Sequence, residues 1–171
     1  ESMGLVYTGW TEHFSSGVDS LAKIENGFTK YDVSAFFKVF QLNTHIDALI
    51  RLRQDDRAKE TISRVLKMIE QHGCKWTLPE VLRLDAVCGL KENGSDRAKA
   101  ETIFLESLEL ARAQKSRLWE LRTAVSLARL WGEGKERQKA YDLLFPAYDW
   151  YTEGFGTADL IDAKGLLEHL Q

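Results

Sequence analysis

Apolar residues recur along this chain at spacings of three, four and seven, which is the period of one face of an α-helix. The clearest series is Ala58, Ile62, Val65, Leu66 and Ile69. Further series lie within residues 36–50, 100–111, 118–128, 140–147 and 160–170. With the turn residues between them, these series predict nine helices, over 3–14, 17–30, 33–52, 55–72, 78–92, 96–114, 117–131, 136–151 and 158–170.

Residues that typically end or begin helices lie between the predicted segments. Gly73 is placed to end a helix in the left-handed conformation that glycine adopts freely. Thr77 and Glu80 have the spacing of a capping box, in which two side chains bond the free amides of a first turn. Gly94 and Gly132 mark two further helix ends. Because such short connections reverse the chain, we expect neighbouring helices to be antiparallel.

A related segment recurs every forty residues. Asp-Arg-Ala-Lys at 56–59 returns unchanged at 96–99 and as Glu-Arg-Gln-Lys at 136–139. Ala128 and Ala140 have the spacing of the small residues that let two helices of a TPR hairpin approach closely, although alanine is common in any helix. We therefore predict a single all-α domain over 1–171, a TPR-like α-α superhelix of about four antiparallel helix pairs plus a C-terminal capping helix.

Composition narrows the functional classes. The formal net charge is −3, without the basic excess that nucleic-acid binding favours. The two cysteines, Cys74 and Cys88, lie fourteen residues apart, which favours a reducing compartment over a disulfide framework. No apolar run reaches the roughly 18 residues of a membrane span. These features predict a cytoplasmic protein that contacts neither nucleic acid nor a membrane.

The sequence contains no recognisable motif for catalysis or metal binding. Residues 132–135, Gly-Glu-Gly-Lys, precede Glu136, where a phosphate-binding loop needs a Ser or Thr hydroxyl for Mg²⁺. The four histidines form no zinc-protease motif, and His72 with Cys74 and Cys88 falls short of a four-ligand zinc site. We therefore predict no catalytic residue, no metal ligand and no cofactor, and hence no enzyme activity.

Two groups of side chains are candidates for partner binding. Six polar residues lie on the helices expected to line the concave side of the stack: Lys38, Gln41, Arg51, Arg83, Arg122 and Arg129. Arginine binds a partner's carboxylate through two parallel hydrogen bonds. The alternative is that these residues are solvated or form ion pairs within the chain, as Arg83 with Glu80 three residues before it.

The second group is an aromatic end patch near the C-terminus. It comprises Tyr148, Trp150, Tyr151 and Phe155. Such a patch either docks another domain or closes the end of the helical stack.

Residues from about 105 to 170 resemble a known family. The matching segments are 106–112 (Glu-Ser-Leu-Glu-Leu-Ala-Arg), 119–122 (Trp-Glu-Leu-Arg), 126–130 (Ser-Leu-Ala-Arg-Leu), 150–155 (Trp-Tyr-Thr-Glu-Gly-Phe) and 157–160 (Thr-Ala-Asp-Leu). In this order they resemble the C-terminal TPR-like region of large bacterial signalling ATPases, which also carry a nucleotidyl-cyclase or winged-helix domain and an NTPase core. Gly156 departs from the Asp usual in that family, and Tyr151 stands where Phe is common.

The resemblance implies a C-terminal fragment of a longer multidomain protein, with ATPase and cyclase motifs in other domains. We accordingly expect a non-catalytic protein–protein interaction and regulatory module. Its partner would be another protein or the upstream NTPase or cyclase domain of the same chain. Two alternatives remain open: a self-association domain that forms a homodimer, and a helical domain that senses a small-molecule effector.

Overall fold

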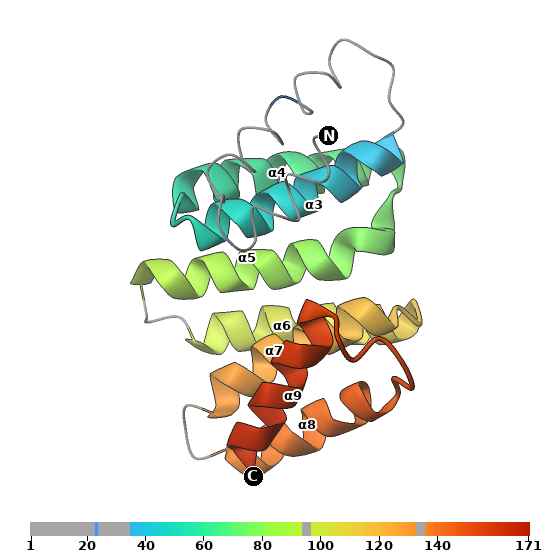
Figure 1. The fold of residues 1–171 in the computed structure, drawn as a ribbon. Helices are drawn as coiled ribbons and strands as arrows, with labels where there is room; N and C mark the ends of the chain where they lie inside the picture. The colour runs from blue at the N-terminus through green and yellow to red at the C-terminus, as the bar shows by residue number, and fades with distance from the viewer. Residues whose placement is uncertain (1–22, 24–34, 94–96, 133–135) are drawn as a thin grey trace. The chain divides into compact units, whose positions relative to one another are not determined.

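The structure, a computed structural model, describes Lys23 and residues 35–93, 97–132 and 136–171, and every regular element in them is helical (Figure 1). The elements are α3 (Ala35–Arg51), α4 (Asp55–His72), a 3-10 turn η1 (Lys75–Thr77), α5 (Leu78–Asn93), α6 (Arg97–Ala113), α7 (Arg117–Gly132), α8 (Arg137–Asp149) and α9 (Ala158–Leu170). The all-α prediction is confirmed, and these seven α-helices end within two residues of their predicted bounds. The helices predicted over 3–14 and 17–30 lie outside the described residues, apart from Lys23, which is helical.

The chain divides into two compact units, Glu1–Cys88 and Gly89–Gln171. Within the described residues, the first unit holds α3, α4, η1 and most of α5, and the second holds α6 to α9. No helix in the described part of the chain has both the length and the apolar character needed to cross a bilayer.

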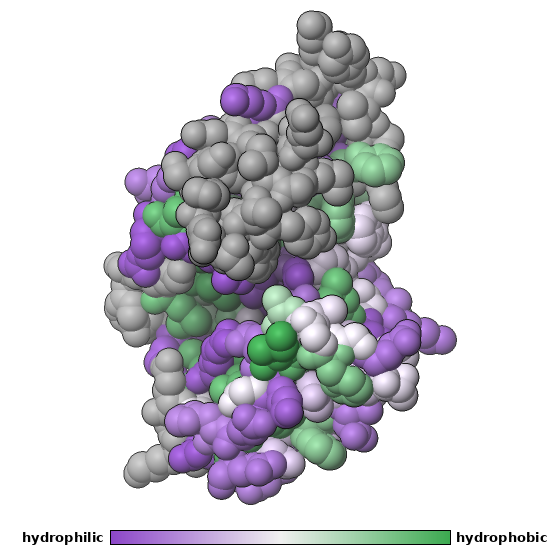
Figure 2. Space-filling model, viewed as in Figure 1, coloured by the Kyte–Doolittle hydropathy of each residue, from purple (hydrophilic) through white to green (hydrophobic). Residues whose placement is uncertain are grey.

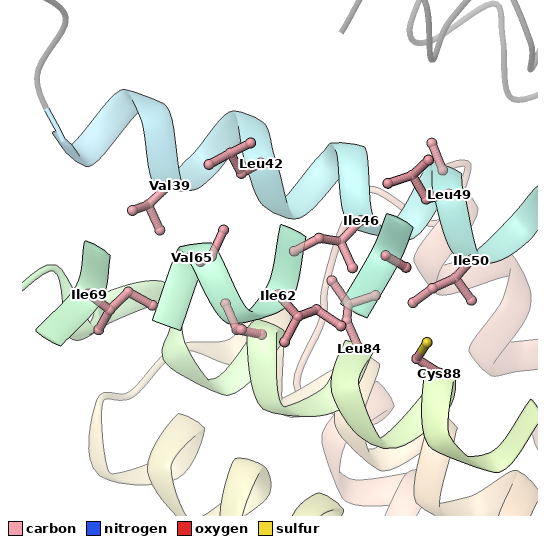
Figure 3. Close-up of a cluster of buried hydrophobic side chains, with 13 residues drawn as sticks. Val39, Leu42, Ile46, Leu49, Ile50, Ile62, Val65, Ile69, Leu84 and Cys88 are labelled. Carbon is pink, nitrogen blue, oxygen red and sulfur yellow. The ribbon is translucent and has the colours of Figure 1, made fainter. Parts of the chain in front are cut away.

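The core of the first unit forms where the apolar faces of α3, α4 and α5 meet (Figure 3). Its principal side chains are Val39, Leu42, Ile46 and Leu49 of α3, Ile62, Val65 and Ile69 of α4, and Leu84 and Cys88 of α5. Each is at most 4% exposed, and burying one such aliphatic side chain is worth about 1.5–3 kcal/mol. The spacing that predicted α4 therefore corresponds to a continuous buried face.

Of the two turn predictions in this unit, one is confirmed and one is wrong. Gly73 ends α4 in the left-handed conformation, with φ of 68°, and its N–H donates to the Ile69 carbonyl at 2.8 Å. Thr77 does not complete a capping box, because its buried hydroxyl has no hydrogen-bond partner among the described residues. The 3-10 turn runs directly into α5, so Thr77 is not the extended flanking residue that a side-chain cap requires.

Helix α7 forms the centre of the second unit and packs against α6, α8 and α9. Ala124, Leu127 and Ala128 are fully buried on it. Ala140, on α8, is also fully buried, as expected for a small residue where two helices approach closely. The α6–α7 contact contains one buried polar bond, between the hydroxyls of Ser107 and Thr123 at 2.9 Å.

A polar cluster joins α6, α7 and α8 at the edge of this unit. The Trp131 indole N–H donates to the Glu101 carboxylate at 2.8 Å, and the Lys139 ammonium lies 3.7 Å from the centre of the same ring. Trp131 is thus bonded along one edge and covered on one face. The cluster fixes the α7 end at which the chain turns toward α8.

Candidate binding site

The loop from α8 to α9 is held in a defined shape by its backbone. Gly154 has φ of 77°, a left-handed conformation that side-chain-bearing residues rarely adopt. The Gly154 carbonyl accepts the Thr157 N–H at 2.9 Å, which closes the turn before α9. At the other end the Tyr151 N–H donates to the Tyr148 carbonyl at 3.1 Å. Backbone hydrogen bonds therefore order both ends of the loop.

This loop and the first turns of α7 and α9 line a pocket of about 690 Å³ that is open to solvent. The lining residues are Leu118, Leu121, Trp150, Tyr151, Thr152, Glu153, Gly154, Thr157, Asp159 and Leu160. The lining is mainly apolar and includes the polar side chains of Thr152, Glu153, Thr157 and Asp159. Its volume falls in the range of pockets that accept a small molecule or a few side chains of a partner.

An ion pair joins α7 and α9 at the wall of the pocket. The Arg122 guanidinium donates two hydrogen bonds to the Asp159 carboxylate, at 2.8 and 2.9 Å. The two side chains are 28% and 32% exposed, so solvent screens the pair only in part. The same guanidinium lies 5.4 Å from the centre of the Trp119 ring. This arrangement holds the start of α9 against α7 beside the pocket.

Two aromatic residues of the pocket are in contact with each other and differ in exposure. Trp150 is 54% exposed, whereas Tyr151 is half-buried. Their rings meet edge to face, with centres 5.2 Å apart. The Arg117 guanidinium lies 5.2 Å from the centre of the Trp150 ring and pairs with Glu120 at 2.7 Å. The pocket therefore presents a supported indole to solvent.

The environment of Tyr151 keeps its hydroxyl protonated. Burial raises the pKa of Tyr151 above 10.0, and the nearby carboxylates of Asp159 and Glu120 raise it further. Arg117 and Arg122 oppose this change only in part. The raised pKa means that the phenol of Tyr151 keeps its proton to a higher pH than an ordinary tyrosine.

The aromatic end patch predicted from the sequence lies at this site. Trp150 and Tyr151 line the pocket. Phe155, which is 48% exposed, packs against the half-buried Tyr148 with ring centres 6.0 Å apart. Figure 2 shows residues of hydrophobic and near-neutral hydropathy over the first turn of α9 and the loop before it, with hydrophilic residues toward the other end of α9.

The four arginines predicted to bind a partner all make ion pairs within the chain. These pairs are Arg51 with Asp47, Arg83 with Glu80, Arg122 with Asp159 and Arg129 with Asp162. The Arg83 pair is the intrahelical one foreseen as an alternative, with Glu80 only 2% exposed. Lys38 and Gln41 are half-buried on α3. Partner binding by these six residues stays a prediction, and Arg122 bonds to Asp159, a residue that lines the pocket.

Sequence reasoning missed the loop and helix-start residues of the site. Glu153, Gly154 and Thr157 carry no binding motif, and they line the pocket because the loop folds back over α7. The available signal was the pair of glycines between two predicted helices, which marks a turn with a special backbone. In the part of the chain that is described, no three His, Cys, Asp or Glu residues gather closely enough to hold a metal ion.

Comparison with known proteins identifies no relative for the chain. No family model matches it, and neither a curated protein nor a solved structure does so. The similarity to signalling ATPases therefore stays a prediction from the quoted segments. The function has to be argued from the site itself.

Proposed function

We propose that this chain is a non-catalytic helical module that binds a segment of a protein partner in the pocket between α7 and the α8–α9 loop. One observation carries the proposal: a mainly apolar, open pocket presents the half-exposed Trp150 beside Tyr151 on a wall fixed by the Arg122–Asp159 pair. The site is built from helix ends and a closed turn. Binding therefore costs little conformational entropy of the chain.

The chemistry of the lining favours a protein partner. Tryptophan, tyrosine and arginine are the residues that most often contribute strongly to protein–protein binding, and here they gather in one place. Trp150 offers a large apolar ring, while Tyr151 and Thr152 add hydroxyl groups that can hydrogen-bond to a peptide backbone. A bulky side chain of the partner would enter between Leu118 and Leu160.

The wider role follows from the repeat and the quoted resemblance. We propose that the helices stack as TPR-like antiparallel pairs and that the chain is a cytoplasmic regulatory region of a bacterial signalling or transcription-regulatory ATPase. Its ligand would then be a partner protein or an upstream domain of the same protein. The forty-residue period and the small buried residue at Ala140 support this arrangement.

The proposal is tested by selecting peptides from a display library on the folded chain and measuring the Kd of the enriched peptides. Replacing Trp150 or Leu118 by Ala is expected to weaken binding about tenfold or more, the effect of removing a central contact residue. Ile161→Ala is the matched control, because Ile161 is 58% exposed on α9 and does not line the pocket. The control should leave the Kd unchanged.

Four results would contradict the proposal. The first is that no peptide is enriched on the folded chain, and the second is that the enriched peptides bind both pocket variants as tightly as the wild type. Hydrolysis of ATP by the purified chain would refute the non-catalytic role. A dimer in light scattering that Trp150→Ala dissociates would show that the occupant is a second copy of this chain.

A further inference from the structure

We infer that the segment bound in this pocket is basic and amphipathic, placing an apolar side chain in the pocket and a lysine or arginine against Glu153. The inference rests on the proposed function and adds the chemical class of the ligand. It is carried by the distribution of charge over the pocket edge.

The charged side chains that line the pocket are both carboxylates, Glu153 and Asp159. Asp159 is neutralised by two hydrogen bonds from Arg122. Glu153 is exposed and has no ion pair or hydrogen bond among the described residues. Glu153 is therefore the one charged side chain of the pocket lining that has no partner among the described residues.

A second source of negative potential lies at the start of the same loop. Asp149 is the last residue of α8, is exposed, and has no ion pair with any described residue. The carboxyl end of a helix carries a partial negative charge, so Asp149 and the end of α8 act in the same direction. Both attract a cation to the start of the loop, next to Trp150.

The pocket also suits the shape of a basic side chain. Lysine and arginine lay an aliphatic stem along apolar surface while the charged end reaches water or a carboxylate. The aromatic rings of Trp150 and Tyr151 attract a cation to their faces. Arg117 already lies over the Trp150 ring, which shows that the indole accepts a guanidinium, and Arg117 shares the Glu120 carboxylate with Arg112.

The test compares two synthetic peptides that share the same apolar residues and carry either Lys or Glu at every polar position. Their Kd values for the whole chain are measured by fluorescence anisotropy. The Lys peptide is expected to bind more tightly, and its Kd should rise with salt. Glu153→Gln should weaken it up to about fivefold and Glu153→Lys about tenfold, as for loss and reversal of one exposed ion pair.

Glu109→Lys is the matched control, because Glu109 is exposed on α6 and does not line the pocket. It changes the net charge equally and should leave the Kd of the Lys peptide within about twofold. Circular dichroism of each variant checks that its helices are retained. The salt dependence of wild-type binding provides a second readout that needs no substitution.

The outcomes separate this inference from the proposed function. Equal binding of the two peptides, or a Kd for the Lys peptide that Glu153→Lys does not change, overturns the basic class. If Trp150→Ala still weakens binding in that case, the pocket remains the site and only the ligand class is wrong. If display-selected peptides bind at the pocket but the Lys peptide does not, the inference is also refuted. If Trp150→Ala changes the Kd of no peptide, both the proposed function and the basic ligand class are refuted.

Discussion

The ion pair between Arg122 and Asp159 should be a measurable link between α7 and α9. It joins residues 37 positions apart through two hydrogen bonds of 2.8 and 2.9 Å. Removing both side chains separately and together gives a double-mutant cycle, with Arg122→Ala and Asp159→Ala as the single variants. The cycle isolates the interaction from the other contacts of each residue.

The structure sets the expected size of the coupling. Ion pairs between fully exposed groups contribute about 0.2–1 kcal/mol, whereas hydrogen bonds to charged groups contribute about 1.5–3 kcal/mol. Arg122 and Asp159 are 28% and 32% exposed, which is between these cases. We therefore expect a coupling of about 1–2 kcal/mol in the free energy of unfolding.

The same two helices supply a control cycle. Arg129 and Asp162 also join α7 to α9, but their side chains are 53% and 46% exposed and a single contact joins them. The coupling expected for this pair is below about 0.5 kcal/mol. The two cycles differ in burial and geometry while sharing the same helices and the same types of residue.

Urea unfolding followed by tryptophan fluorescence measures both cycles, because Trp119, Trp131 and Trp150 all lie in the second unit. At a slope of about 2 kcal/mol per molar urea, the larger coupling corresponds to about 0.5–1 M in the midpoint. Equal couplings in the two cycles, or a value near zero for Arg122 and Asp159, would show that the pair does not hold α9 in place.

Three further predictions concern the same unit. Gly154→Ala should destabilise the protein by about 1–2 kcal/mol, because Gly154 has φ of 77°. The control Gly165→Ala should stabilise it by about 0.5–1 kcal/mol, because Gly165 lies within α9 and nothing lies within 4 Å of the added methyl. Equal melting temperatures of the two variants would refute the loop geometry. Ala140→Leu should cost about 1–3 kcal/mol by overpacking a fully buried position, and an unchanged melting curve would argue that Ala140 faces water. Tyr151 should ionise above pH 10, so its contribution to stability is full below the pKa of the unfolded chain and is lost as pH rises through the pKa of the folded chain. The difference between the ultraviolet titrations of wild type and Tyr151→Phe reports this ionisation, and a titration at the ordinary tyrosine pKa would contradict the prediction.

Local signals in the sequence were sufficient for the helices. The apolar series through Ile62, Val65 and Ile69 reports burial on one face, and the helix that it predicts, α4, has the same bounds in the structure. The role of Gly73 as the end of α4 could be predicted because the left-handed conformation at a helix end favours a residue without a side chain. These features depend on neighbours within about one helical turn, which is the range over which a sequence pattern is informative.

The site depends on contacts that no local pattern contains. Arg122 looked available for a partner because its carboxylate, Asp159, lies 37 residues away on a helix whose direction the sequence does not specify. Thr77 has the spacing of a cap, but it lies inside the 3-10 turn that runs directly into α5, and its hydroxyl bonds to no described residue. Glu153 became a candidate only when the path of the α8–α9 loop was known.

The most direct test of the account is a spectrum of the ¹⁵N-labelled chain with and without a display-selected peptide. The indole N–H signal of Trp150, assigned from its loss in Trp150→Phe, should shift on peptide binding because the ring lines the pocket. The signal of Trp131, which is 7% exposed and bonded to Glu101, should stay in place. A saturating peptide that leaves the Trp150 signal unmoved would contradict the claim that this pocket is the binding site.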